Sequence, residues 1–151
     1  MGFPFSSGDI LTASDMNSIG AFVSFTPTFT TGLTTGNGTT EADYALVGEK
    51  LCFFRIRFTL GSTSAVTGEV RCTYPFTVDD TWLAGISLCE FEDSSGSEIR
   101  GRVYRYDGTE FRLTYDSVVS SKIQPGTLSS SQPFSWTTND KMSVKGIVKL
   151  A

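Results

Sequence analysis

The sequence predicts an all-β protein, an antiparallel β-sandwich or jelly roll that follows a short N-terminal arm and helix. The chain of 151 residues contains 19 Ser and 20 Thr, and 13% of its residues are aromatic, a composition that favours strands and turns over helices. Apolar residues alternate with polar ones over much of the chain, between turn-forming residues. No helical pattern separates the strand patterns, which argues against a βαβ fold and for one domain of antiparallel strands.

Residues 1–21 are expected to form an arm and a helix, ahead of a β-sandwich body over residues 22–151. Thr12 can cap a helix that starts at Ala13, with Asp15 in its first turn, and Gly20 suits the left-handed position at its end. A helix of about two turns is not stable alone. The apolar residues of this segment therefore need a partner surface, on their own body or on another protein; they are Phe3, Phe5, Leu11, Met16 and Ile19.

The clearest strand pattern covers residues 51–60. Cys52, Phe54, Ile56, Phe58 and Leu60 share one face, which we expect in the core. Further strands are expected over residues 22–29, 42–47, 68–74, 81–92, 98–106, 110–117, 120–123 and 141–150. Pro27 should interrupt the first of them, and the glycine-rich residues 31–38 are expected to form a loop.

Two hairpins are predicted in the second half of the chain. Asp107-Gly108 is typical of a two-residue type I′ turn, which would place Tyr104 opposite Phe111 and Arg105 opposite Glu110. A second turn over residues 93–97 would bring Glu90 and Glu92 close to Arg102 and Arg100, respectively. Three consecutive antiparallel strands follow from these turns.

Composition disfavours several classes of function. The chain has no histidine, which removes the usual general base and the commonest transition-metal ligand. Its net charge is −4, so it has no basic field for nucleic acid. No apolar run approaches the length that spans a bilayer, and no signal-peptide pattern opens the chain. We therefore expect synthesis in a cytoplasm, with Cys52, Cys72 and Cys89 reduced and buried.

Candidate catalytic and metal sites have simpler explanations, so we expect no catalytic residues, metal or cofactor. Asp79 and Asp80 resemble a pair of glycosidase carboxylates, but adjacent aspartates before a strand are usually turn residues. A second acidic group offers oxygen ligands for calcium, yet its spacing fits no calcium loop and arginines lie nearby to neutralise it. This group consists of Glu90, Glu92, Asp93 and Glu98.

Binding surfaces are better supported than catalytic sites. Trp82 and Trp136 are more often core or interface residues, although stacking on a glycan is an alternative. Arginines recur within the predicted strands, among them those at positions 55, 57, 71, 100, 102 and 105. They are explained by a polar outer sheet face, or by an arginine–glutamate network between subunits. The predicted oligomer interface comprises Phe53, Arg55, Arg57, Arg100, Arg102 and Tyr104.

Short motifs at both ends of the chain resemble those of small virion proteins of tailed bacteriophages. Residues 8–17, GDILTASDMN, are similar to the G-D-x-L-T-A-x-D-x-N opening of many minor tail, fibre and head-fibre proteins. Gly36-Asn37-Gly38-Thr39 is followed by Y-x-x-V-G over residues 44–48 and by PFSWTTND over residues 133–140. Such proteins often show these three motifs in the same order.

This resemblance implies a structural virion protein without fixed catalytic residues. It implies an N-terminal segment that docks on the particle and a β-sandwich that associates with copies of itself, usually as a trimer. The first expectation is a tail, tail-fibre or adaptor protein; the second is a protein that decorates the capsid. A third expectation, from another class, is a receptor- or glycan-binding module for host attachment. Its partners would be other virion proteins, its own copies and a host surface glycan.

Overall fold

The computed structural model of the chain is all-β over the residues that it describes, namely 12, 20–48, 50–79 and 87–151. The strand bounds are β1 Val23–Ser24, β2 Phe29–Thr34, β3 Thr39–Val47, β4 Leu51–Thr59, β5 Ala65–Thr73, β6 Ser87–Glu92, β7 Glu98–Arg105, β8 Glu110–Val119, β9 Lys122–Thr127 and β10 Lys141–Lys149. Every strand pair is antiparallel, which confirms the prediction of an all-β fold of antiparallel strands.

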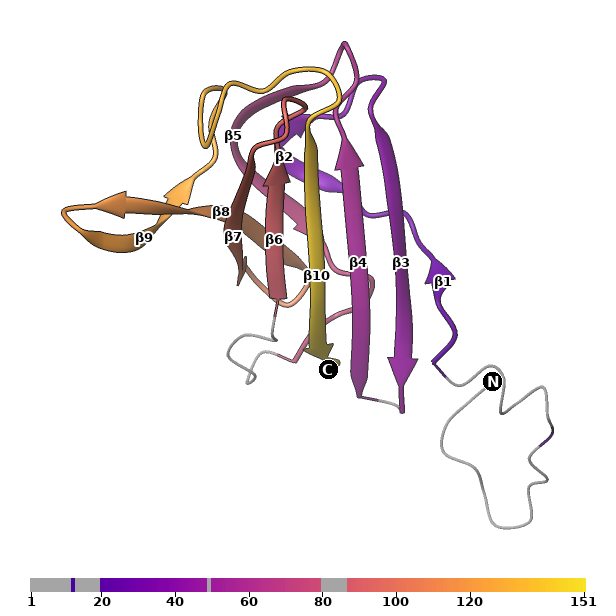
Figure 1. Ribbon diagram of the computed structural model, residues 1–151. Helices are drawn as coiled ribbons and strands as arrows, with labels where there is room; N and C mark the ends of the chain where they lie inside the picture. The colour runs from indigo at the N-terminus through magenta and orange to yellow at the C-terminus, as the bar shows by residue number, and fades with distance from the viewer. Residues whose placement is uncertain (1–11, 13–19, 49, 80–86) are drawn as a thin grey trace.

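The strands form one curled sheet in the order β1-β3-β4-β10-β6-β7-β8-β5-β2 (Figure 1). Its two ends approach each other, because the ring of Phe29 on β2 packs 5.3 Å from the ring of Phe58 on β4. The result is a half-barrel with a concave inner face and a convex outer face. β9 lies off this path: it pairs with the second half of β8, and the two strands leave the body as a projecting ribbon (Figure 1).

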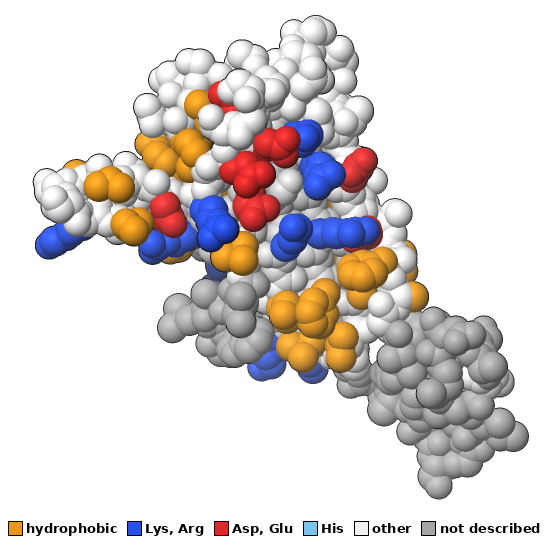
Figure 2. Space-filling model, viewed as in Figure 1, with side chains coloured by type: hydrophobic (Ala, Val, Ile, Leu, Met, Phe, Trp, Pro, Cys, Tyr) orange, Lys and Arg blue, Asp and Glu red, His pale blue; other side chains and the backbone are white. Residues whose placement is uncertain are grey.

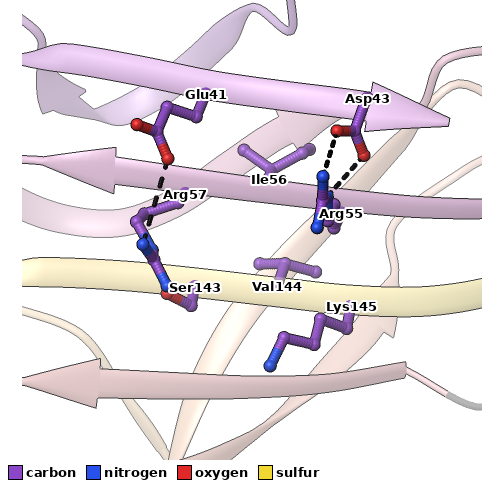
Figure 3. A pocket seen from close by; sticks show the side chains of 8 residues that line it. All are labelled: Glu41, Asp43, Arg55, Ile56, Arg57, Ser143, Val144 and Lys145. Atoms are coloured by element: carbon purple, nitrogen blue, oxygen red, sulfur yellow. Dashed lines mark hydrogen bonds and ion pairs between the residues drawn. The ribbon is translucent and has the colours of Figure 1, made fainter. Parts of the chain in front are cut away.

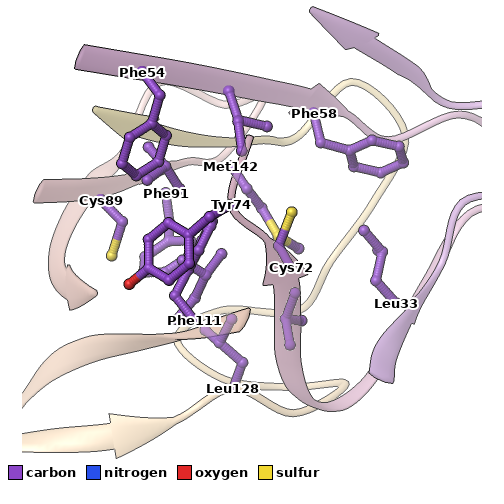
Figure 4. Packing of buried hydrophobic residues seen from close by; sticks show 14 of the residues in the cluster. Leu33, Phe54, Phe58, Cys72, Tyr74, Cys89, Phe91, Phe111, Leu128 and Met142 are labelled. Atoms are coloured by element: carbon purple, nitrogen blue, oxygen red, sulfur yellow. The ribbon is translucent and has the colours of Figure 1, made fainter. Parts of the chain in front are cut away.

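The inner face of the half-barrel holds the hydrophobic core (Figure 4). Cys52, Phe54, Ile56, Phe58 and Leu60 are all buried, as the alternation predicts. Phe54 joins opposite walls of the core, since its ring lies 5.7 Å from Tyr74 and 5.8 Å from Phe111. This packing fixes the curvature of the sheet and turns the odd-numbered residues of β4 to the outer face.

The region before residue 40 differs from expectation. The strand expected over residues 22–29 is reduced to β1, and residues 29–34, mostly expected in a loop, form β2 on β5. Gly32 explains how a strand tolerates this sequence. It adopts φ +73° at a register shift, and a Cβ there would lie 2.1 Å from the carbonyl oxygen of Glu69. The glycine marks a bulge in a strand instead of a loop.

The predicted register of the Asp107-Gly108 hairpin is wrong by one residue. Tyr104 lies opposite Arg112, and Arg105 lies opposite Phe111. A type I′ turn needs positive φ at both central residues, and neither Asp107 nor Gly108 has it. Instead, Oδ1 of Asp107 accepts hydrogen bonds from the backbone N–H groups of Thr109 and Glu110, which closes a wider turn.

Two of the short motifs have clear structural roles. In Gly36-Asn37-Gly38-Thr39, the side chain of Asn37 accepts a hydrogen bond from the N–H of Thr63 at 2.9 Å, which joins two turns. In residues 133–140, the indole N–H of Trp136 donates to the carbonyl of Ser129 at 3.0 Å. The fully buried Asp140 accepts from the backbone N–H of Thr137 at 2.6 Å. Both motifs therefore hold loops at one end of the half-barrel.

Several predictions fall outside the described residues. These include the arm and the helix from Ala13, the docking residues Phe3, Phe5, Leu11, Met16 and Ile19, and also Asp80 and Trp82. Gly20 is described and adopts φ +72°, the left-handed conformation expected of it. Within the described parts of the chain, no helix is long and apolar enough to cross a membrane.

Candidate interaction face

The outer face of the half-barrel carries its surface residues in rows that run across the strands. One row contains Glu41, Arg57, Ser143, Glu90 and Arg100, which lie opposite one another on β3, β4, β10, β6 and β7. The next row contains Asp43, Arg55, Lys145, Leu88 and Arg102 on the same strands. We call the charged residues of these two rows the charged band. Antiparallel register therefore gathers residues from five strands on one face.

Ion pairs order the charged band at its β3–β4 end (Figure 3). The guanidinium of Arg55 binds both carboxylate oxygens of Asp43 at 2.6 Å, and these bonds raise the pKa of Arg55. Arg57 lies 3.9 Å from Glu41. Together with Lys145, these residues line an open pocket of about 280 Å³. Both acids that line the pocket are therefore paired with arginines.

An apolar groove of about 320 Å³ adjoins the charged band on the same face (Figure 2). Phe22, Phe53, Leu88 and Ile147 form its walls. Gly146 forms part of its floor, and a Cβ there would meet the ring of Phe54 at 2.7 Å. Arg55 and Lys145 line both the groove and the charged pocket. The two features are therefore one continuous surface, which we call the interaction face.

A second ion-pair cluster lies on the other wall of the half-barrel. Glu69 on β5 binds Arg71 at 2.7 Å and Arg112 on β8 at 3.2 Å. Hydrogen bonds from these arginines, Arg71 first, hold the pKa of Glu69 below its ordinary value. The guanidinium of Arg71 also stacks on Tyr106, 3.6 Å from the ring centroid. This cluster joins the two neighbouring strands β5 and β8.

The structure brings the predicted interface residues together only in part. Phe53, Arg55 and Arg57 project from the outer face of β4 beside the groove and band. Arg100 and Arg102 lie on β7, beyond β10 and β6, and Arg102 pairs with Asp116 at 2.9 Å. Tyr104 lies farther along β7, where the guanidinium of Arg112 approaches its ring at 5.5 Å. The predicted set thus spans the convex face instead of forming one patch.

Sequence reasoning missed the apolar half of the interaction face. Phe22, Leu88 and Ile147 come from three distant segments, so no local pattern reveals that they surround Phe53. It also missed the ion pair of Glu92 with Lys141, at 2.7 Å, and the place of Arg112 in the Glu69 cluster. The expected pairing of Glu90 with Arg102 and of Glu92 with Arg100 is wrong by two residues, because Glu90 lies opposite Arg100 and Glu92 lies opposite Glu98.

Two other candidate residues, Trp136 and Asp79, make contacts within the fold. The ring of Trp136 packs 4.6 Å from Phe134 and 5.9 Å from Phe91, in addition to the bond of its indole N–H. Asp79 pairs with Lys149 of β10. Among the residues that the structure describes, no group of three potential ligands could hold a metal ion.

The three cysteines lie in the core on β4, β5 and β6, and their predicted burial is confirmed. Burial raises the pKa of Cys52 to about 11 and that of Cys72 and Cys89 to about 12. Thiols with such values are almost wholly protonated at neutral pH and react slowly.

Comparisons of the chain with protein families, curated proteins and solved structures found no match.

Proposed function

We propose that the protein is a non-enzymatic structural component of a tailed-phage virion, acting as a tail, tail-fibre or adaptor protein. One observation carries the proposal: a single sheet face presents an apolar groove continuous with an ordered band of ion pairs. An apolar centre with a charged, arginine-rich border is typical of protein–protein contacts. The assignment to a virion is supported in addition by the resemblance of residues 8–17, 36–48 and 133–140 to phage virion proteins.

Two parts of the chain have different roles in this proposal, attachment to the particle and self-association. Residues 1–20, with the helix expected from Ala13, attach the protein to another virion subunit. The body, a sandwich-like or jelly-roll arrangement of the curled sheet, associates through its interaction face, as a trimer. Synthesis would take place in the bacterial cytoplasm before assembly into the particle.

Chemistry on the interaction face favours binding over catalysis. A glycosidase needs two carboxyl groups separated by about 5–10 Å across a cleft, one of them able to carry a proton. Asp43 is instead held by two short bonds from Arg55, and Glu41 faces Arg57. Such pairs occupy the carboxylate oxygens, which suits a surface that selects a partner by charge.

Virion assembly tests the proposal. Particles should be purified from cells in which the encoding phage carries either the full chain or a chain without residues 1–20. We expect the truncated protein to keep the same circular dichroism spectrum and Tm but to be lost from the particles. Full-length chain with Phe3→Asp and Phe5→Asp should behave in the same way, while Ser6→Asp with Ser7→Asp serves as the matched control.

Normal incorporation of both the truncated and the Phe-substituted chains would contradict docking through residues 1–20. Absence of the wild-type chain from purified particles would contradict the virion assignment itself.

A further inference from the structure

The β8–β9 ribbon presents a second apolar surface that the described residues of its own chain leave uncovered. β7 stays paired with β8 from Arg105↔Phe111 to Gly101↔Tyr115, and β9 continues the pairing of β8 to Val119↔Lys122. The base of the ribbon is anchored, because the hydroxyl of Tyr115 donates to Gln132 at 2.9 Å. Beyond this base the two strands project from the body (Figure 1).

One face of the projecting ribbon is apolar. Val118 and Ile123 lie opposite each other, and their exposed fractions are 73% and 63%. Pro125 follows on the same face, opposite Asp116 at the base. Residues 117–127 contain a single charge, that of Lys122, which lies on the opposite face with Val119. A two-stranded ribbon with so little charge is marginal in water unless its apolar face is covered.

The apolar groove of the interaction face has the matching chemistry. Its walls include Leu88, which is 65% exposed, and its volume of about 320 Å³ has room for a few aliphatic side chains. The ribbon points away from this groove, so it cannot cover the groove of its own chain (Figures 1 and 2). The two uncovered surfaces can meet only between different copies.

We propose that the apolar face of the β8–β9 ribbon docks into the apolar groove of a second copy. Val118, Ile123 and Pro125 of one copy contact Phe53, Leu88 and Ile147 of the next. Because the two surfaces differ, the contact is head-to-tail, and in the proposed trimer three such contacts close a ring of copies. This inference rests on the self-association part of the proposed function and names the surfaces that form the contact.

Sedimentation of the full chain tests whether the ribbon holds the copies together. We expect the wild-type protein to sediment as an oligomer, and the variant with Val118→Asp and Ile123→Asp to sediment as a single species of 16.4 kDa. Gln124→Asp adds a charge to the same strand on the opposite face and should leave the oligomer intact. Unchanged Tm values would show that the variants remain folded.

Crosslinking tests which surfaces meet. Val118→Cys and Lys145→Cys chains, co-produced with different tags, should be joined by a bismaleimide, while each variant alone should give no crosslinked dimer. The native thiols do not interfere, because all three are buried. Thr138→Cys, an exposed position outside the groove, should replace Lys145→Cys without giving crosslinks.

Crosslinks in Lys145→Cys alone would indicate groove-to-groove contact, and those in Val118→Cys alone would indicate ribbon-to-ribbon contact. Either result, or an oligomer that survives Val118→Asp with Ile123→Asp, would overturn the inference and leave the virion assignment standing. A monomeric wild-type chain would overturn the inference and self-association together. Loss of the chain from particles with these crosslinks intact would instead overturn the virion assignment alone.

Discussion

Replacing Phe54 by Ala should show how strongly the outer face depends on the core behind it. Phe54 is 2% exposed and contacts Tyr74 and Phe111 on the opposite wall. Losing its burial costs about 1.5–3 kcal/mol, and losing two aromatic pairs costs about 0.5–1.5 kcal/mol each. We therefore expect Phe54→Ala to lower the free energy of unfolding by about 3–5 kcal/mol, the usual range for such a truncation.

Urea unfolding followed by tryptophan fluorescence measures this change. With a slope of about 2 kcal/mol per molar urea, the midpoint should fall by about 1.5–2.5 M. Phe53→Ala is the matched control, because Phe53 is the next residue of β4 but lies on the outer face with 39% of its surface exposed. It should cost at most about 1 kcal/mol. Equal losses for the two variants would refute the assignment of inner and outer faces.

Two further predictions follow from the electrostatics and the thiols. Native protein at pH 8 should react very slowly with Ellman's reagent, because burial raises the pKa of Cys52 to about 11 and that of Cys72 and Cys89 to about 12. Unfolding should release three reactive thiols. Fast reaction of the folded chain would contradict the burial of the cysteines. Because Arg71 and Arg112 lower the pKa of Glu69, its contribution to stability is present above the unfolded pKa and is lost as pH falls through the folded value. Between pH 7 and pH 3 the wild type should therefore lose more stability, measured by urea midpoint, than Glu69→Gln; equal losses would show that the cluster is solvent-screened.

The sequence predicted what depends on local periodicity. Strict alternation over residues 51–60 has one physical solution, a strand with a buried even face, and β4 has that face buried. Burial of Cys52 follows from the same pattern. The order of the strands in the sheet and their curvature depend instead on contacts between distant residues, such as Phe29 with Phe58, which no local pattern contains.

Side chains that bond to the backbone caused the clearest error. The sequence Asp107-Gly108 favours a tight turn, but the carboxylate of Asp107 stabilises a wider turn and shifts the register by one residue. In this register Val103 instead of Arg102 lies opposite the buried Leu113, while Arg112 reaches Glu69 on the surface. A shift of one residue changes which residues of two paired strands share a face, so the turn and the pairing of side chains must be predicted together.

The candidate site was predictable in its charges but not in its shape. Arginines two residues apart on a strand must share a face, which correctly grouped Arg55 with Arg57 and Arg100 with Arg102. The groove forms where β4, β10 and β6 lie side by side and Phe22 closes one end, an arrangement set by topology alone.

Electron microscopy of purified particles tests the central claim, that this chain is a structural part of a tailed virion. The encoding phage should carry the chain with a C-terminal tag, and antibody-bound gold or a reconstructed density should then locate it. We expect a ring of copies on the tail or its fibres, with residues 1–20 against another subunit. Label on the head would assign the protein to capsid decoration instead, and intact particles without the chain would contradict the claim.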